Sequence, residues 1–600
     1  MSEIDQPTSS ERAAMPTNGV DSAQSVRWLP GLVIAGLYWV VVKSVELLAE
    51  SNVVIFMTTF FSPMVTTVLF LLAWLGFSRR PWNERIWGIL FFISTGGASR
   101  FLAHRSMAYG LILYGLPVVI TTWAIWGWAT RSITSLVMRR MTLAATMLLT
   151  WSYFCLLRLD GLDGGMQSTC NWRWTPTAED RFLAKVGRKA DEASSTSESA
   201  IAEVVAKPSD WIGFRGPQRD GVVKGVRIET DWAAHPPKLV WKQPIGPGWS
   251  SFAVVDGRVF TQEQRGEDEC VTCYDAANGA EIWCHRDATR FSEPVAGAGP
   301  RGTPQFHDGK LFAQGASGHL ICLDAVTGKR LWLADTAADS KAPTPIWGFS
   351  SSPLVVAGVV TVLPGGPNGA SVLGYRIEDG QLAWKAGEGT AGYASVHLTE
   401  LQGTPMLIAL TSQGATGLEP SSGRSVWQHA WVSDQEMRIA QPMFVEESRL
   451  LIPTGQSLGA RLIDVRRNEE QWTTSEVWTS KEFKPYFNDY VQYAGHAYGF
   501  DNLFCCINLA NGKRTWKKGR YGSGQVLLLA DQGLLLVLSE TGDIVLLEAS
   551  PKSHVELAKF PAIEGKTWNH PALVGDQLFV RNGEQIACYR LPLLSERNSQ

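Results

Sequence analysis

Five short segments of this chain repeat one pattern, a glycine followed four residues later by a tryptophan. The copies are AANGAEIW (276–283), AVTGKRLW (325–332), IEDGQLAW (377–384), EPSSGRSVW (419–427) and LANGKRTW (509–516). Glycine supplies the positive φ of a tight hairpin turn, and the tryptophan ends a strand that packs against the next copy. Trp241 and Trp478 end similar strands without this turn, and the seven tryptophans are 38 to 52 residues apart. That period predicts β-propeller blades of four short strands.

The repeats predict an all-β propeller of eight blades. The first seven run over 250–287, 303–335, 352–387, 394–430, 440–479, 489–518 and 524–560, and the seventh lacks the tryptophan. A lone strand at Leu239–Ile245 precedes the first blade, and the run 570–591 supplies three strands without a fourth. We therefore predict that the last blade is shared by both ends of the domain, with Leu239–Ile245 paired to Gln585–Leu591, because this removes the free sheet edges.

The region before the propeller is predicted to be all-α and transmembrane. About 20 apolar residues are needed to cross a bilayer, and the apolar segments are 29–48, 53–77, 86–101, 107–129 and 141–157. The third segment is short and contains Gly96 and Gly97, which makes it the weakest of the five. The predicted parts are a disordered cytoplasmic tail (1–27), transmembrane helices (28–159), a short helix and flexible linker (160–210), the propeller (211–592) and a tail (593–600).

The distribution of arginines predicts the orientation. With five crossings and an inside N-terminus, eight arginines lie on the cytoplasmic side and only Arg100 and Arg105 lie outside. This topology predicts a multi-pass protein of the bacterial inner membrane with its propeller in the periplasm. The net charge of -3 gives no reason to expect a nucleic-acid partner. The expected partners are the lipid bilayer, other envelope proteins and a small-molecule ligand of unknown identity.

Lys43 and Glu46 share one face of the first predicted helix, since they are three residues apart. One interpretation is an intramembrane polar site for a quinone or a proton. The other is that both side chains reach toward the outer interface from the end of the helix.

The repeats VTCYDAANGAEIW and LICLDAVTGKRLW resemble those of the pyrroloquinoline quinone (PQQ)-type propeller superfamily over about residues 211–592. That superfamily includes quinoprotein alcohol and glucose dehydrogenases and the lipoprotein subunit of the outer-membrane β-barrel assembly machinery. WIGFRGPQRDG, EQRG and AGAGPRGTP also look like segments of bacterial membrane proteins with PQQ-like propellers. Five helices before an exported propeller is similar to the plan of membrane-bound glucose dehydrogenase. The resemblance implies PQQ with Ca²⁺ as a cofactor to be tested.

The nine cysteines suggest a metal or redox site, but their positions favour packing. Cys270 and Cys273 have knuckle-like spacing, yet no second pair completes a zinc site. Cys505 and Cys506 are adjacent, and some quinoprotein dehydrogenases carry a vicinal disulfide against the cofactor. However, one repeat position is cysteine in four blades, at residues 273, 322, 506 and 588. We interpret it as a small buried packing position.

A candidate ligand site lies where residues just before each innermost strand point into the central channel. The predicted ring is Trp249, Arg301, Trp347, Tyr393, Arg438, Asn488, Tyr521 and Trp568. Aromatic faces and guanidinium groups on one axis suit a flat anionic or polyol ligand. The alternative is that these residues only fill the channel and pack blade against blade.

A second candidate is a charged cluster in blade one and the loop after it. Its members are Glu263, Arg265, Arg290, Glu293 and Arg301. The alternative is a set of surface ion pairs. No spacing of acidic residues singles out a calcium site or a catalytic base, and the long insertions that quinoprotein dehydrogenases place around the cofactor are missing. We therefore expect a membrane-anchored periplasmic binding or scaffolding module. The alternative is a PQQ-dependent dehydrogenase that oxidises an alcohol or sugar and reduces membrane quinone.

Overall fold

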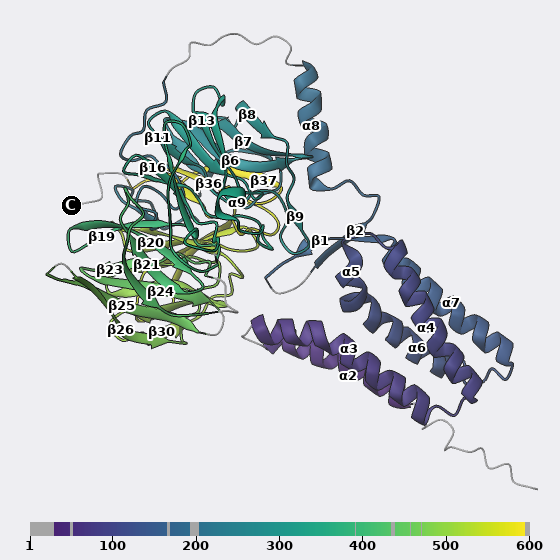
Figure 1. The fold of residues 1–600 in the computed structure, drawn as a ribbon. Helices are drawn as coiled ribbons and strands as arrows, with labels where there is room; N and C mark the ends of the chain where they lie inside the picture. Colours follow the sequence, from purple (N-terminus) through teal and green to yellow (C-terminus); the bar gives the residue numbers. More distant parts are fainter. Residues whose placement is uncertain are drawn as a thin grey trace, which may run out of the picture. The chain divides into compact units, whose positions relative to one another are not determined.

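The computed structural model describes residues 29–48, 52–164, 168–192, 203–390, 392–433, 438–455, 458–469 and 471–594. These residues form two compact units, one of helices and one that contains the propeller (Figure 1). The predicted N-terminal tail, residues 595–600 of the predicted C-terminal tail and the serine-rich part of the predicted linker lie outside the described residues.

Unit one consists of helices. They are α2 (Leu29–Leu48), α3 (Asn52–Phe77), α4 (Trp82–Leu102), α5 (Met107–Gly110), the π-helical turn η1 (Leu111–Gly115), α6 (Leu116–Ala129) and α7 (Leu136–Cys155). Within the described residues, three helical stretches are long and apolar enough to cross a membrane: Leu29–Leu48, Val54–Phe77 and Met107–Ala129. Thus the structure supports three candidate membrane helices, and α4 and α7 are not among them.

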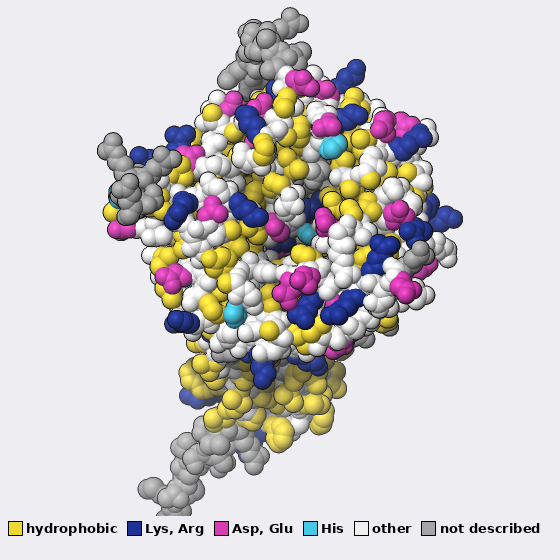
Figure 2. Space-filling view, turned by 90° about the vertical axis from the view of Figure 1, so that its left-hand side faces the viewer, with side chains coloured by type: hydrophobic (Ala, Val, Ile, Leu, Met, Phe, Trp, Pro, Cys, Tyr) yellow, Lys and Arg dark blue, Asp and Glu magenta, His cyan; other side chains and the backbone are white. Residues whose placement is uncertain are grey.

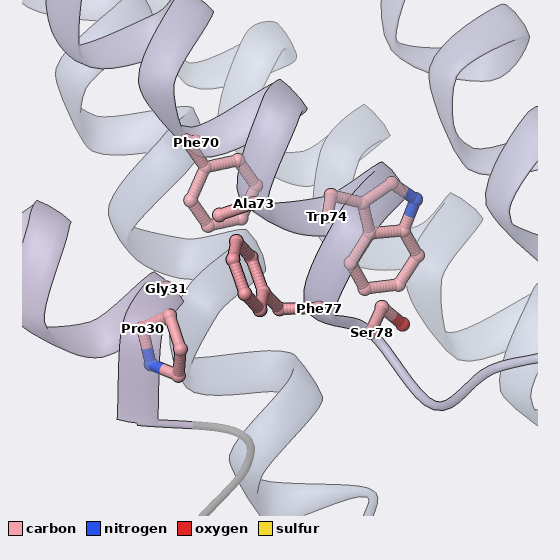
Figure 3. Close-up of a pocket in the computed structure, with 7 residues that line it drawn as sticks. All are labelled: Pro30, Gly31, Phe70, Ala73, Trp74, Phe77 and Ser78. Atoms are coloured by element: carbon pink, nitrogen blue, oxygen red, sulfur yellow. The ribbon is translucent and has the colours of Figure 1, made fainter.

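Aromatic side chains pack these helices together. Trp123 of α6 is fully buried, and its ring centroid lies 5.3 Å from that of Phe70, 5.0 Å from Trp74 and 5.8 Å from Phe92. Figure 3 shows the rings of α3 gathered around the first turn of α2. They leave a cavity of only about 10 Å³, no more than one water molecule requires.

Two charged pairs in this unit have different surroundings. Glu84 of α4 is buried and pairs with Arg139 of α7 at 2.8 Å. Lys43 and Glu46 pair at 2.7 Å on the surface of α2, with the Lys43 side chain 64% exposed. The first pair ties two helices together, whereas the second is accessible.

The second unit begins with a segment that contains the helix α8 (Ala178–Glu192). Thr177 caps this helix, because its hydroxyl accepts from the Asp180 amide while the Asp180 carboxylate accepts from the Thr177 amide. The segment 160–210 thus contains one described α-helix, and Thr177 is its cap. Upstream, β1 (Leu157–Leu162) pairs with β2 (Ser168–Trp172).

The propeller has eight antiparallel blades, as the repeats predict. The strands of blades one to four are β5–β8 (253–255, 258–265, 268–275, 281–287), β11–β14 (305–307, 310–314, 319–324, 330–335), β15–β18 (354–356, 359–362, 372–376, 382–386) and β19–β22 (397–401, 404–411, 414–418, 425–430). Those of blades five to seven are β23–β26 (443–446, 449–455, 459–468, 471–480), β27–β30 (491–493, 496–501, 503–508, 514–517) and β31–β34 (525–529, 534–538, 543–548, 556–561). The core lies between neighbouring blades, where the two faces of each sheet are buried.

The eighth sheet has the order β35-β36-β37-β4. Its strands are β35 (Ala572–Val574), β36 (Gln577–Arg581), β37 (Gln585–Arg590) and β4 (Lys238–Pro244). β4 is antiparallel to β37, with Trp241 opposite Cys588. A short strand, β3 (Val222–Val223), adds in parallel to the inner strand of blade seven.

Five of the seven tryptophans dock on the glycine turn of the next blade. A Cβ on Gly279, Gly328, Gly380, Gly423 or Gly512 would lie 2.4–2.7 Å from the ring of Trp241, Trp283, Trp332, Trp384 or Trp478, respectively. Several of these indoles also donate to a carbonyl beside that turn, as Trp283 does to Ala325 at 3.2 Å. The glycine is therefore needed for space as well as for its positive φ, which is +69° at Gly328. This confirms that the tryptophan packs against the next copy.

The repeat cysteines pack against the same tryptophans. Cys273, Cys322, Cys506 and Cys588 are fully buried and lie directly opposite Trp283, Trp332, Trp516 and Trp241, respectively. In blades three and four a glycine takes this place. The position is small because an indole covers it, which confirms the packing interpretation.

Candidate functional site

Polar residues, here called the belt, surround the central channel and connect neighbouring blades by hydrogen bonds. The belt residues are Ser251, Thr303, Ser352, Ser395, Gln441, Asp489, Gln525 and His570, one from the start of each inner strand. In six steps from Ser251 to Gln525, the backbone amide of one belt residue donates to the side-chain oxygen of the next, at 2.7–3.2 Å. Blade eight completes the circle, because Gln525 donates to the Trp568 carbonyl and Ser251 donates to the His570 carbonyl.

One end of the channel is closed by the segment Trp211–Gly221, here called the plug. Trp211 exchanges two backbone hydrogen bonds with Val254 of blade one, and Ile212 accepts from Phe306 of blade two. Arg219 donates to the Ser352 and Pro353 carbonyls of blade three. Arg215 donates to the Tyr490 carbonyl of blade six, and Gly221 accepts from Leu528 of blade seven. The plug thus joins the inner strands of five blades by hydrogen bonds.

Charged and histidine side chains form the floor between the belt and the plug. Asp489 bonds His570 at 3.1 Å and lies 3.6 Å from Arg215 Nε. Burial alone would raise the pKa of Asp489, but the charge of Arg215 and the hydrogen bond with His570 lower it by more than this. The net pKa is below its usual value, so the carboxylate is charged. Burial and Arg219 lower the pKa of His397 to about 3, so this imidazole is neutral. Figure 2 shows a hollow at the centre of one face with acidic, basic and histidine side chains around it.

At the other end, here called the mouth, six aromatic side chains form an arc. Ring centroids are 4.9–6.4 Å apart along the series Trp249, Trp568, Phe487, Tyr486, Trp347 and Tyr393. All six are only half-buried. Such an arc offers stacking faces to a ligand at the end of the channel.

Charged groups flank this arc. The Lys566 ammonium lies 4.4 Å from the Trp568 ring centroid and 5.2 Å from that of Trp249. Burial lowers the pKa of Lys566 to about 8, against the attraction of Glu293 and Glu540. The Glu540 carboxylate accepts from Trp568 Nε1 at 2.7 Å and from the Ser523 amide at 2.9 Å.

The structure brings five of the eight predicted ring residues to this end of the channel. They are Trp249, Arg301, Trp347, Tyr393 and Trp568. The remaining three residues do not line this end of the channel. Arg438 is buried and donates to carbonyls of blades four and five, Asn488 is buried and donates to Gly524, and Tyr521 bonds His554 and Glu556 at the outer strand β34.

Sequence reasoning missed Tyr486, Phe487, Glu540 and Lys566. Phe487 could have been predicted from its position, because it lies two residues before the belt residue Asp489. Trp249 and Trp568 have the same spacing from Ser251 and His570. Glu540 and Lys566 lie in loops of blades seven and eight and carry no repeat signal.

The predicted charged cluster separates into three groups. Glu263 and Arg265 form a buried pair within blade one, with an Oε1–Nε distance of 2.9 Å. Arg290 pairs with Glu179 of α8 at 2.8 Å. Glu293 pairs with Arg301 at 3.1 Å beside the mouth. The five residues thus have partners in three different places: the core of blade one, α8 and the mouth.

In the arrangement that the structure describes, the mouth forms no site for PQQ held by Ca²⁺. Among the described residues, no group of three His, Cys, Asp or Glu side chains converges as a metal site. The indoles of Trp249 and Trp568 contact each other, and Lys566 covers both, so no flat ring can lie between them. Cys505 and Cys506 are fully buried in two different cores on opposite faces of β29.

Comparisons with known proteins agree with this architecture. A family model described as outer membrane protein assembly factor BamB matches residues 233–344 and 267–518. The quinohemoprotein alcohol dehydrogenase ADH-IIG of Pseudomonas putida is 35% identical over 138 residues, which are 22% of this chain and 18% of the relative. ADH IIB of the same organism is 29% identical over 188 residues, which are 29% of this chain and 24% of the relative. The matches thus span less than a quarter of these relatives.

Two solved structures are similar at low identity. The quinohemoprotein alcohol dehydrogenase of Comamonas testosteroni has a TM-score of 0.48 at 13% identity, over 70% of this chain and 85% of that chain. BamB of Moraxella catarrhalis has a TM-score of 0.43 at 14% identity, over 59% of this chain and 98% of that chain. By its repeats and this family match, the domain is a β-propeller similar to the PQQ-like propellers of BamB and of quinohemoprotein alcohol dehydrogenases.

Proposed function

We propose that this chain is a membrane-anchored binding or scaffolding protein whose propeller presents the mouth to a ligand or envelope partner. The observation that supports this most is the state of the acidic groups at the mouth. Glu293 is neutralised by Arg301 and caps two backbone amides, and Glu540 accepts three hydrogen bonds. Carboxylates satisfied in this way hold loops in place and are poorly suited to act as bases.

We further propose that α4 and α7 complete a five-helix anchor in the bacterial inner membrane, with the propeller in the periplasm. The buried Glu84–Arg139 pair supports this, because it neutralises charge on α4 and α7 where these helices meet. The arginine asymmetry supports the same orientation.

We also propose that pairing of β4 with β37 closes the ring in the folded protein. The eight hydrogen-bonded sheets and the polar belt support a closed circle. With β4 paired to β37, the eighth blade has its fourth strand, and β37 has no unpaired edge.

The binding proposal is tested by equilibrium dialysis of the detergent-solubilised full chain with PQQ and Ca²⁺. We expect no stoichiometric retention of PQQ, in wild type or in Trp568→Ala. Stoichiometric retention that the Trp568 substitution abolishes would overturn the proposal and place a cofactor at the mouth.

A second candidate function is a PQQ-dependent dehydrogenase. The local identity to quinohemoprotein alcohol dehydrogenases favours it, as does the aromatic pair at the mouth. It requires that Lys566 and the indoles rearrange to admit the cofactor, and the dialysis experiment separates the two functions.

A further inference from the structure

A short stretch that precedes the propeller in sequence, Asp160–Gly164, lies on the mouth; it is here called the strap. The Leu162 amide donates to the Val295 carbonyl at 3.1 Å, and the Leu162 carbonyl accepts from Lys566 at 2.9 Å. The Gly164 amide donates to Glu540 at 2.7 Å. Every one of these bonds uses a backbone group of the strap, so the mouth binds it as an extended peptide.

The strap also fits by shape. A Cβ on Gly164 would lie 2.3 Å from Ser523 Oγ and 3.0 Å from Glu540 Oε1. Gly161 has a φ of +97°, and its Cβ would lie 3.1 Å from Lys566 Nζ. Between these glycines the Leu162 side chain is buried, with 7% exposed. The contacts therefore define a sequence pattern: glycine, a buried apolar residue, an acidic residue whose charge attracts Lys566, and glycine.

We propose that the mouth is a binding site for extended peptide segments of this pattern, and that the strap is its resting occupant. This rests on the proposed binding function and names its ligand class: a glycine-containing segment of another envelope protein. Because the strap belongs to the same chain, it has a high effective concentration, and an external peptide must displace it to bind. Lys566 and Glu540 supply the polar contacts, and the half-buried aromatic arc supplies the adjoining surface.

The first test is hydrogen exchange on the full chain in detergent. The amides of Leu162 and Gly164 should be protected in wild type and exchange at least tenfold faster in Gly164→Ala, where the added Cβ displaces the strap. Gly583→Ala is the matched control, because no atom lies within 4 Å of its Cβ. Equal, fast exchange in all three proteins would overturn the proposal.

The second test is binding of a fluorescently labelled peptide with the sequence DGLDGG, measured by anisotropy. We expect Gly164→Ala to bind it at least tenfold more tightly than wild type or Gly583→Ala, because its mouth is free. Adding Glu540→Gln should remove that binding, since its amide nitrogen would replace one carboxylate oxygen and face one or two of the N–H donors that Glu540 now accepts from. Unchanged thermal unfolding shows that the variants are folded. Failure of Gly164→Ala to bind, or binding that Glu540→Gln leaves intact, would contradict the proposal. Neither measurement involves PQQ. Retention of PQQ in the dialysis experiment would therefore count against the proposed function, whereas failure of the peptide to bind would count against the peptide site alone.

Discussion

The docking of Trp283 on Gly328 of the next blade predicts a specific response to Gly328→Ala. The added methyl would lie 2.5 Å from the Trp283 ring, at a residue whose φ is +69°. Gly309 in the same blade also has a φ of +69°, but no atom lies within 4 Å of its Cβ. The two substitutions therefore impose the same backbone strain, and only the first disturbs the contact between blades.

The expected magnitudes follow from these contacts. A left-handed alanine costs about 1–2 kcal/mol, which is all that Gly309→Ala should lose. Gly328→Ala adds an overpacking cost of about 1–3 kcal/mol. It also weakens the Trp283 hydrogen bond to Ala325, worth about 1 kcal/mol. We expect a total loss of roughly 3–6 kcal/mol, of which half or more comes from the disturbed contact with Trp283.

The assay is denaturant unfolding of the full chain in a mild detergent, followed by near-ultraviolet circular dichroism. Both variants are compared with wild type under conditions where refolding is complete. Equal losses for Gly309→Ala and Gly328→Ala would refute the claim that the glycine turn is a docking surface for Trp283.

Three further predictions concern closure, pH and topology. Deletion of 570–600 removes β35–β37 and leaves Trp241 without its sheet, so the propeller should lose its cooperative melting transition; a truncated protein that melts like the full chain would show another closure. His397 has a pKa of about 3 in the folded protein, below its usual value of about 6.5 in an unfolded chain. The contribution of the neutral imidazole to the free energy of unfolding should therefore be fully present above about pH 6.5 and fall by about 1.4 kcal/mol per pH unit below it. His397→Gln should therefore lose less stability than wild type between pH 7.5 and 5, and equal losses would contradict this. A reporter fused after Gln600 should be active only in the periplasm, and cytoplasmic activity would refute the five-helix topology.

The blades were predictable because their strongest signal is local. The spacing of glycine and tryptophan reflects a contact between neighbouring turns, and the repeated cysteine reflects the indole opposite it. Both constraints recur at a fixed period, so one sequence reveals them. The eight-bladed arrangement followed from counting these copies.

The mouth was predictable only in part, because loops of different lengths precede the inner strands. Arg438 and Tyr521 were chosen by distance from a strand, whereas the polar belt residue is the better reference point. Glu540 and Lys566 reach the mouth from loops with no repeat signal. The strap belongs to no blade, and its contacts depend on tertiary structure alone.

Composition also could not decide the number of membrane helices. Hydropathy treats Glu84 and Arg139 as two isolated charges, but the folded helices pair them at 2.8 Å. Such pairing neutralises charge near the starts of α4 and α7, and it becomes visible only when these helices are packed together.

The central claim, that the mouth binds without catalysing oxidation, is tested most directly by a turnover assay. Membranes containing the full chain are incubated with PQQ and Ca²⁺, and the oxidation of alcohols and sugars is followed with an artificial electron-accepting dye. The account predicts the same rate as in membranes without the protein. A rate that depends on added PQQ and is lost in Trp568→Ala would contradict it.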